Sequence, residues 1–230
     1  MVRVRHVWPA MLLIAAATAR SSPGETYWVN YEASSGLFPE EAGWTRYTRD
    51  GGDQRWFEDG WLVMDGRRDP RIQDFNRFYR SLDPQPGEEF ILQWRISVDE
   101  LSGYHDPEIG VFSDEKWAVG FIMSLTEIRS EFEQNVSASF EPGLPHTFEL
   151  RSRDMRAYSL RIDGVEAIRG SFWLSLWASE VGWGDGGYGA ASLARWKYVR
   201  FGVVPEPDSG ICLVIGATLG LFGISAKGMR

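Results

Sequence analysis

Cysteine is almost absent from the sequence, and histidine is scarce. The only cysteine among the 230 residues is Cys212, which lies in an uncharged apolar run near the end of the chain. The rest of the chain therefore has no disulfide, no thiolate nucleophile and no cysteine-based zinc site. Outside the first ten residues the only histidines are His105 and His146, so a three-histidine metal site is excluded there.

An excess of basic residues is also missing. The chain has 24 lysines and arginines against 32 aspartates and glutamates, which gives a formal net charge of −8 at pH 7. Nucleic-acid binding depends on a basic surface that releases counterions, so the composition argues against a nucleic-acid partner. Neutral or cationic partners, and cation binding, remain open.

The part between Thr26 and Val203 shows no convincing helical period and none of the common nucleophile, phosphate-loop or zinc-protease motifs. It has a period of two instead. In the stretch EFILQWRISVD, one face carries only apolar side chains, namely Phe90, Leu92, Trp94, Ile96 and Val98. Turn signals such as Asp59-Gly60 recur about every ten residues, and short strands at that spacing predict an all-β antiparallel sandwich.

The first nineteen residues have the pattern of an export signal. Arg3 and Arg5 precede a short apolar stretch, and Ala17-Thr18-Ala19 supplies the small residues of a cleavage site. A packed N-terminal helix is the alternative, but Pro9 would disturb it. We therefore expect a signal peptide over residues 1–19 and secretion by the general export pathway.

The end of the chain has the pattern of a membrane anchor. Residues 209–226 carry no charge, and eighteen residues of helix span about 27 Å, enough for a thin hydrocarbon core. Lys227 and Arg230 follow at once, and the positive-inside rule keeps that end in the cytoplasm. The sequence thus predicts a C-terminal transmembrane helix with the main domain outside.

A four-residue motif precedes this apolar run. It consists of Val204, Pro205, Glu206 and Pro207. Together with the spacer, helix and basic end, it resembles the PEP-CTERM sorting signal of bacterial surface proteins. The resemblance implies recognition by an exosortase-type sorting enzyme and delivery to the bacterial cell surface or outer envelope. The basic end, with only two residues, is shorter than the arginine cluster of that family.

Two longer stretches in the middle resemble concanavalin-like and laminin-G-like domains. PHTFELRSRDMRAYSLRIDGVEAI has a His-Thr turn, a strand and a second strand that ends in Asp-Gly, and VGWGDGGYGAASLARWKYVRF resembles the closing stretch of those domains. The resemblance implies an antiparallel jelly-roll sandwich over residues 26–203. The chain then divides into residues 1–19, 26–203 and 204–230.

The strongest candidate for catalysis is the stretch EIRSEFE. On one strand, Glu127, Arg129, Glu131 and Glu133 would point to the same face. Laminarinase-type glycoside hydrolases of the concanavalin-like fold carry Glu-x-Asp-x-Glu on one strand, which implies Glu127 as nucleophile and Glu131 as acid/base. Here Arg129 replaces the central Asp and favours two ionised carboxylates, which opposes the raised pKa of a general acid. A solvated Glu–Arg–Glu ladder is therefore the preferred interpretation.

Other polar candidates are weaker. His105, Asp106 and Glu108 could form a metal pair or a His–carboxylate dyad, although Asp-Pro is typical of a turn. Asp185 could bind calcium together with backbone oxygens of its glycine-rich loop, which a tight turn explains equally well. Calcium is the only cofactor the sequence suggests. His146 is interpreted as structural.

Aromatic side chains are the other possible source of function. A sugar ring stacks on an aromatic face, while polar rims bond its hydroxyls. Five residues could line such a face, with core packing as the alternative for each: Trp117, Trp173, Trp177, Trp183 and Tyr188.

These observations lead to one interpretation and two alternatives. We expect an exported surface or extracellular-matrix protein with a non-catalytic glycan-binding jelly roll. Its partners would be extracellular polysaccharide, the sorting enzyme and, through the C-terminal helix, the membrane. The first alternative is a retaining hydrolase, which needs Glu127 and Glu131 to converge in an open cleft. The second is a purely structural surface protein, which would have neither a cleft nor an exposed aromatic platform.

Overall fold

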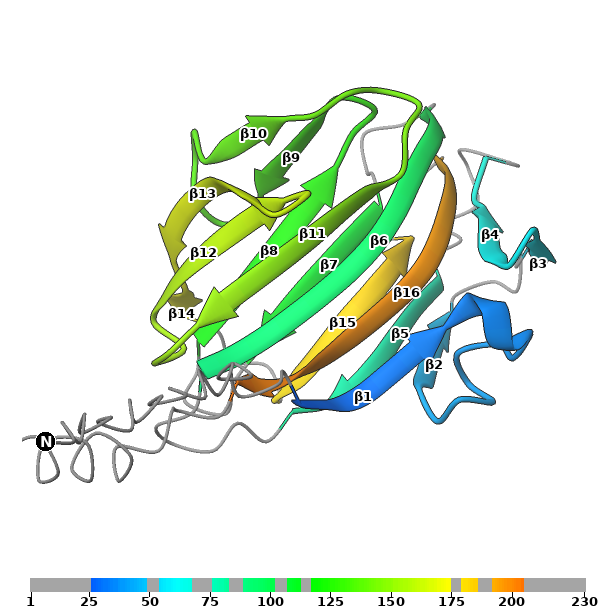
Figure 1. The fold of residues 1–230 in the computed structure, drawn as a ribbon, viewed down its shortest axis with the longest axis horizontal. Coiled ribbons are helices and arrows are strands. Elements are labelled where there is room, and N and C mark those ends of the chain that lie inside the picture. Colours follow the sequence, from blue (N-terminus) through cyan, green and yellow to red (C-terminus); the bar gives the residue numbers. More distant parts are fainter. Residues whose placement is uncertain are drawn as a thin grey trace, which may run out of the picture.

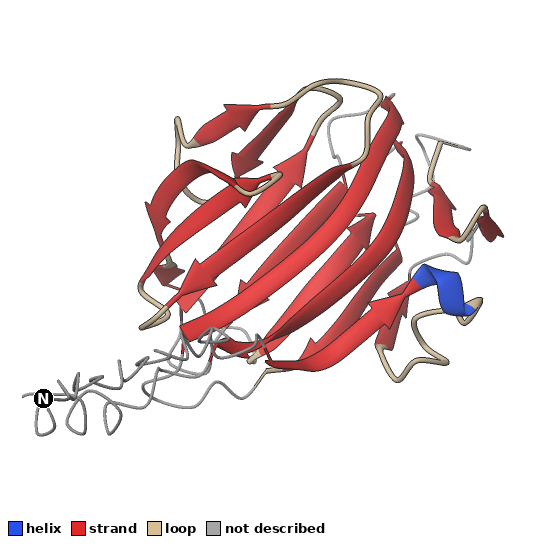
Figure 2. Cartoon of the chain, viewed as in Figure 1, coloured by secondary structure: helices blue, strands red, loops and turns tan. Residues whose placement is uncertain are grey.

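The computed structural model describes residues 26–48, 54–67, 76–82, 89–101, 107–112, 117–174, 179–185 and 192–204. Within these ranges the regular secondary structure is strand apart from one short helical turn, η1 (Ala33–Ser35), and turns and loops connect the strands (Figure 2). The expected signal peptide and C-terminal helix lie outside the described residues. No helix in the described part is long and apolar enough to cross a membrane.

Two antiparallel sheets stack face to face (Figure 1). Sheet A has the strand order β13-β12-β11-β6-β16-β4-β3, and β1 pairs with part of β16. Its strands are β1 (Thr26–Glu32), β3 (Arg55–Glu58), β4 (Trp61–Asp65), β6 (Glu89–Leu101), β11 (His146–Ser152), β12 (Ala157–Ile162), β13 (Val165–Ser171) and β16 (Ser192–Val204).

Sheet B has the order β10-β9-β8-β7-β15-β5-β2, and the short β14 pairs with β8. Its strands are β2 (Thr45–Thr48), β5 (Asn76–Ser81), β7 (Pro107–Phe112), β8 (Trp117–Met123), β9 (Glu127–Ser130), β10 (Ser137–Ser139), β14 (Trp173–Leu174) and β15 (Glu180–Asp185). Every strand pairing is antiparallel, which confirms the predicted all-β sandwich.

The core lies between the sheets and follows the alternation of the sequence. All five apolar residues predicted for one face of β6 are buried there. Trp94 of β6 stacks on Phe148 of β11 with ring centroids 5.3 Å apart. Trp183 of sheet B packs against Trp196 of sheet A with ring centroids 4.8 Å apart, so large aromatic rings connect the two layers.

The outer face of sheet A is covered by polar side chains that bond to one another. Arg200 donates a hydrogen bond to Gln93 (3.0 Å), and Gln93 donates to Glu149 (3.1 Å). Glu149 also accepts a 2.7 Å bond from Arg151 and lies 3.5 Å from Arg161. These five side chains thus form one connected polar network.

The last described strand extends slightly further than the sequence suggested. Val204, assigned above to the sorting motif, is the final residue of β16 and pairs with Glu89 of β6. The sandwich therefore includes Val204, while Pro205, Glu206 and Pro207 lie outside the described residues.

Candidate functional site

The outer face of sheet B carries a continuous row of cross-strand neighbours. Directly opposed residues of an antiparallel sheet point to the same face, so the register defines which side chains line up. One row, here called the Tyr47–Arg129 row, crosses six strands: Tyr47, Arg77, Gly184, Glu108, Ile122 and Arg129. Tyr47 at one end is 57% exposed.

The adjacent row contains three glycines. It runs through Tyr79, Gly182, Gly110 and Gly120, and the amide of Glu131 donates a 2.8 Å bond to the carbonyl of Gly120. A Cβ on Gly182 would lie 2.8 Å from the Tyr79 ring, and one on Gly120 would lie 2.5 Å from a Glu131 carboxylate oxygen. Glycine at these positions therefore lets Tyr79 and Glu131 lie against the sheet from opposite sides of Gly110.

A small pocket of about 20 Å³ lies between these two adjacent rows. It is lined by Arg77, Tyr79, Glu108, Ile109, Gly110, Glu131 and Gly182. Arg77 and Glu108 form an ion pair. Burial raises the pKa of Glu108 to about 7; Arg77 opposes this rise, and the nearby Glu131 adds to it. Burial also raises the pKa of the Tyr79 phenol.

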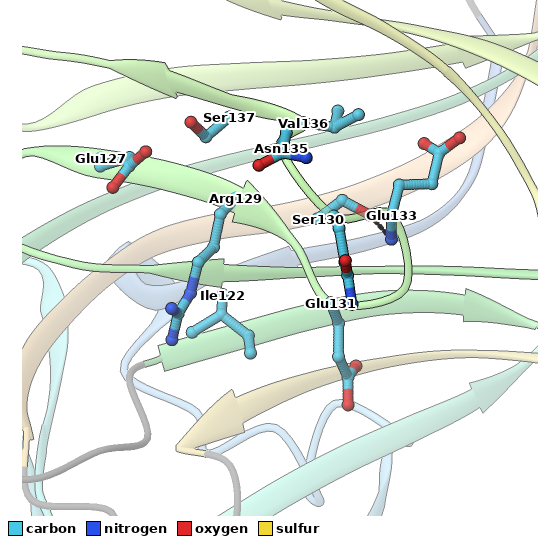
Figure 3. A pocket seen from close by; sticks show the side chains of 10 residues that line it. Ile122, Glu127, Arg129, Ser130, Glu131, Glu133, Asn135, Val136 and Ser137 are labelled. Atoms are coloured by element: carbon cyan, nitrogen blue, oxygen red, sulfur yellow. Dashed lines mark hydrogen bonds between the residues drawn. The ribbon is translucent and has the colours of Figure 1, made fainter.

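A larger hollow of about 630 Å³ lies beside this pocket, along β9, the turn after it and the start of β10. Its lining includes Glu127, Arg129, Glu131, Asn135 and Ser137. Figure 3 shows Arg129 and Glu131 extending to the same side of β9. Glu131 lines both the hollow and the small pocket, so the two are adjacent and share this residue as a wall.

The predicted Glu–Arg–Glu ladder is wrong. Among the described residues, the side chains of Glu127, Arg129 and Glu131 make no ion pair or hydrogen bond with one another. Glu127 and Glu131 do line the same hollow, as the hydrolase alternative requires. Three charged groups thus line the hollow without bonding to one another.

The strand predicted over residues 127–133 is shorter than expected. β9 ends at Ser130, whose hydroxyl accepts a 3.1 Å bond from the Glu133 amide, and Asn135 takes the left-handed backbone conformation with φ 67°. Glu133 consequently points away from Glu131 (Figure 3). Its carboxylate accepts bonds from the Tyr158 hydroxyl (2.9 Å) and the Ser171 amide (3.1 Å).

The aromatic candidates separate into different environments. Trp183 is only 1% exposed and packs in the core, so its predicted stacking on a ligand is wrong. Trp173 is 57% exposed on β14, opposite Ala118 of β8. Trp117 is the first residue of β8, and the structure describes its backbone only; Trp177 and Tyr188 lie outside the described residues.

Asp185 points into the sandwich and not into an exposed loop. It is 4% exposed and lies 3.2 Å from the hydroxyl of Ser192 in sheet A. Burial raises its pKa to about 7. Across the described ranges, no three histidine, cysteine or acidic residues group as metal ligands, and Asp185 calcium binding stays a prediction.

The histidine cluster is separated too. His105 and Asp106 lie outside the described residues, whereas Glu108 lies in the small pocket. His146, expected to be structural, is 8% exposed; its Nδ1 lies 2.6 Å from Asp163 and its Nε2 2.7 Å from the Glu141 carbonyl. Both ring nitrogens are used in holding this turn.

Sequence reasoning missed most of the pocket, although a signal for it is present. Three strands place a glycine between two inward apolar residues, in the stretches EIGVF, AVGFI and EVGWG. Such a glycine marks the outer face, and three in register mark a floor on which neighbouring side chains converge. Arg77 and Tyr79 carry no comparable signal.

Comparisons with known proteins identify the fold. No protein-family model and no curated protein matches the sequence. Among solved structures, a carbohydrate esterase from a Shiga toxin-encoding bacteriophage aligns with a TM-score of 0.59 and 12% identity, over 79% of this chain and 100% of that one.

Two further structures align over similar lengths. A structure from work on endo-acting O-glycanases of the human gut microbiota has a TM-score of 0.58 and 11% identity, over 79% of this chain and 100% of that one. A protein with a galectin-like fold from Bacillus subtilis aligns with a TM-score of 0.50 and 12% identity, over 80% of this chain and 99% of that one. At these identities the likeness establishes a jelly-roll sandwich and nothing finer.

Proposed function

We propose that the protein is an exported surface or extracellular-matrix protein whose sandwich binds glycan without catalysis. The observation that carries this proposal is the hollow of about 630 Å³, in which the side chains of Glu127, Arg129 and Glu131 form no ion pair or hydrogen bond with one another. Its volume lies in the usual range for ligand pockets, and fixed carboxylates and a guanidinium suit sugar hydroxyls as bonding partners.

Three further observations support the proposal. The hollow shares Glu131 as a wall with a second pocket, and Tyr47 is an exposed aromatic residue on the same sheet. A purely structural surface protein would need neither feature. In addition, the phage esterase and the gut-microbiota structure, both named for carbohydrate-active proteins, share this fold.

Export and sorting belong to the proposal as well. The signal-like first nineteen residues and the motif Val204 to Pro207 support secretion, recognition by an exosortase-type enzyme and a membrane-anchored precursor. The acidic net charge is compatible with an extracellular polysaccharide partner and unfavourable for nucleic acid.

The experiment is a glycan-array screen of the full-length chain, followed by Arg129→Ser. Arg129 is exposed and unpartnered among the described residues, so its replacement should weaken glycan binding without unfolding the domain. Arg156→Ser, at an exposed position in the turn between β11 and β12 of sheet A, is the matched control. Absence of binding to every glycan would refute the proposal.

Hydrolysis of a glycosidic bond is a second candidate, and one observation favours it. Glu108 and Glu131 line the same small pocket in unlike environments, since Glu108 is 17% exposed with a pKa near 7 and Glu131 is exposed. When two carboxyl groups lie in such different environments, one can act as the general acid and the other as the general base. Glu108 would protonate the leaving oxygen while Glu131 accepts a proton from the attacking water.

A further inference from the structure

Glu131 connects two parts of the site, and the register extends the connection across the sheet. The hollow at β9 and β10 and the small pocket over Gly110 share Glu131 as a wall. From the pocket, the Tyr47–Arg129 row continues through Arg77 to Tyr47, its direct cross-strand neighbour on β2. Hollow, pocket and exposed ring therefore lie on one line perpendicular to the strands.

We propose that this line binds the interior of a linear polysaccharide without acidic groups, a refinement that rests on the proposed function. The line passes from β9 over β8, β7, β15 and β5 to β2. Five interstrand steps of about 4.8 Å give about 24 Å, so one sugar ring cannot contact both ends. β2 and β10 are the outermost strands of sheet B, so a bound polysaccharide can extend beyond the sheet at either edge.

The charged side chains along the line determine which polysaccharides can bind, namely those without acidic groups. Glu127 and Glu131 present two carboxylates in the hollow against the single guanidinium of Arg129. Glu108 is paired with Arg77, so that pair adds no positive charge. An acidic polymer would meet uncompensated carboxylates, whereas a neutral or amine-bearing chain would not.

Tyr47 is the stacking platform at the far end of the line. Its side chain is 57% exposed and shares the outer face with Arg77, because the two residues are directly opposed. An aromatic ring there would pack against the apolar face of a sugar, as aromatic rings do in many binding sites. A ligand too short to reach from the hollow to β2 would gain nothing from it.

The test measures binding of the full-length chain to β-1,3- and β-1,4-glucan oligosaccharides of two to eight sugars by calorimetry. Affinity should rise with length, and Tyr47→Ala should weaken the longest ligand between about two- and tenfold while leaving the shortest unchanged. Polygalacturonate, an acidic polymer, should not bind.

Trp173→Ala is the matched control, since Trp173 is equally exposed on the same face but lies opposite Ala118, away from the line. It should change no affinity. Length-independent binding, equal losses for short and long ligands in Tyr47→Ala, a loss in Trp173→Ala, or binding of polygalacturonate would each overturn the linear site and leave glycan binding intact. If none of these glucans and no glycan on the array binds, both proposals fail.

Discussion

The hydroxyl of Tyr158 donates a 2.9 Å hydrogen bond to the carboxylate of Glu133 and thereby joins the outer strands of sheet A to the turn after β9. The same carboxylate accepts a bond from the Ser171 amide. Gly170 leaves room for this contact, because a Cβ there would lie 2.3 Å from Glu133 and 2.4 Å from the Tyr158 hydroxyl. The turn that walls the hollow is thus held from the opposite sheet.

Tyr158→Phe should loosen that wall. Removing a hydrogen bond to a charged group at a buried residue should lower the free energy of unfolding by about 1–3 kcal/mol, and glycan affinity should fall as the turn gains freedom. Chemical denaturation and binding measurements check the two effects. Tyr198→Phe is the control, since the Tyr198 hydroxyl bonds to nothing in the described part of the chain. Unchanged affinity in Tyr158→Phe would show that the turn is held by other contacts.

A second prediction concerns a buried ion pair at the edge of the core. Arg55 binds Glu40 through two hydrogen bonds of 2.7 and 2.8 Å, and its guanidinium lies 4.6 Å from the Phe38 ring centroid. The Arg55 side chain is 7% exposed and that of Glu40 34%. Loss of the carboxylate leaves a largely buried cation without its bidentate partner.

Glu40→Ala should therefore lower the free energy of unfolding by about 2–3 kcal/mol, less than for a fully buried pair because Glu40 is partly exposed. Thermal or urea unfolding measures the change. Glu166→Ala is the control: it breaks the exposed ion pair with Arg169 and should leave the unfolding midpoint unchanged. Equal effects of the two substitutions would mean that the ion pair between Arg55 and Glu40 stabilises the fold no more than an exposed pair does.

The sequence predicted the sandwich well because burial repeats every second residue. Phe90, Leu92 and Trp94 had to face the core once β6 was a strand, and they do. The same argument could not place Trp183, since aromatic residues suit both a core and a sugar platform. Only the glycines on either side, Gly182 and Gly184, show in hindsight which face of β15 is the outer one.

The site was harder to predict because it depends on register. Arg77 and Glu108 lie on strands separated by β15, and nothing in the local sequence says that they pair. The stretch EIRSEFE drew attention to Glu131, which lines the hollow, but the strand predicted from it was too long. The strand ends where the Ser130 hydroxyl accepts a hydrogen bond from the Glu133 amide and where Asn135 takes the left-handed conformation, and both are turn effects that alternation does not contain.

The buried carboxyl of Asp185 should make stability depend on pH. Its pKa is raised from 3.8 to about 7, so the folded state keeps the proton over a range where the unfolded state has lost it. Stability should then fall as the pH rises from about 4 to about 7, by up to about 1.4 kcal/mol per unit, and level off above. Urea unfolding across this range shows the slope.

Asp185→Asn should flatten this slope and be more stable than the wild type above pH 7, with the difference shrinking toward pH 4. Asp59→Asn, at an exposed turn with φ 49° that Asn also accepts, controls for loss of a surface carboxylate. An unchanged slope in Asp185→Asn would assign the pH dependence to other groups, Glu108 first among them.

The tail prediction follows from composition alone. Residues 209–226 are uncharged, and Lys227 and Arg230 follow them, so the full-length precursor should fractionate with membranes. Deletion of residues 209–230 should release the domain into the soluble fraction, because β16, the last strand in the described part of the chain, ends at Val204. A full-length precursor found entirely in the soluble fraction would contradict the anchor.

The last prediction decides between binding and hydrolysis at Glu131. If Glu108 and Glu131 act as acid and base, their removal should cost orders of magnitude in rate, because the two carboxyl groups act as a unit. Arg77 pairs with Glu108 and favours its ionised form, which works against proton donation even though burial raises the pKa to about 7. We therefore expect the purified wild type to release no reducing sugar from β-glucan.

Glu131→Gln and Glu108→Gln should in that case differ only in binding and stability. Glu131 is exposed, so Glu131→Gln should change the free energy of unfolding little, whereas Glu108→Gln leaves Arg77 without its carboxylate at 30% exposure and should cost more. Glu58→Gln, at an exposed position on β3 of sheet A and outside both pockets, is the matched control for activity. Sugar release by the wild type that disappears in Glu108→Gln and Glu131→Gln but persists in Glu58→Gln would establish the enzyme in place of the binding module.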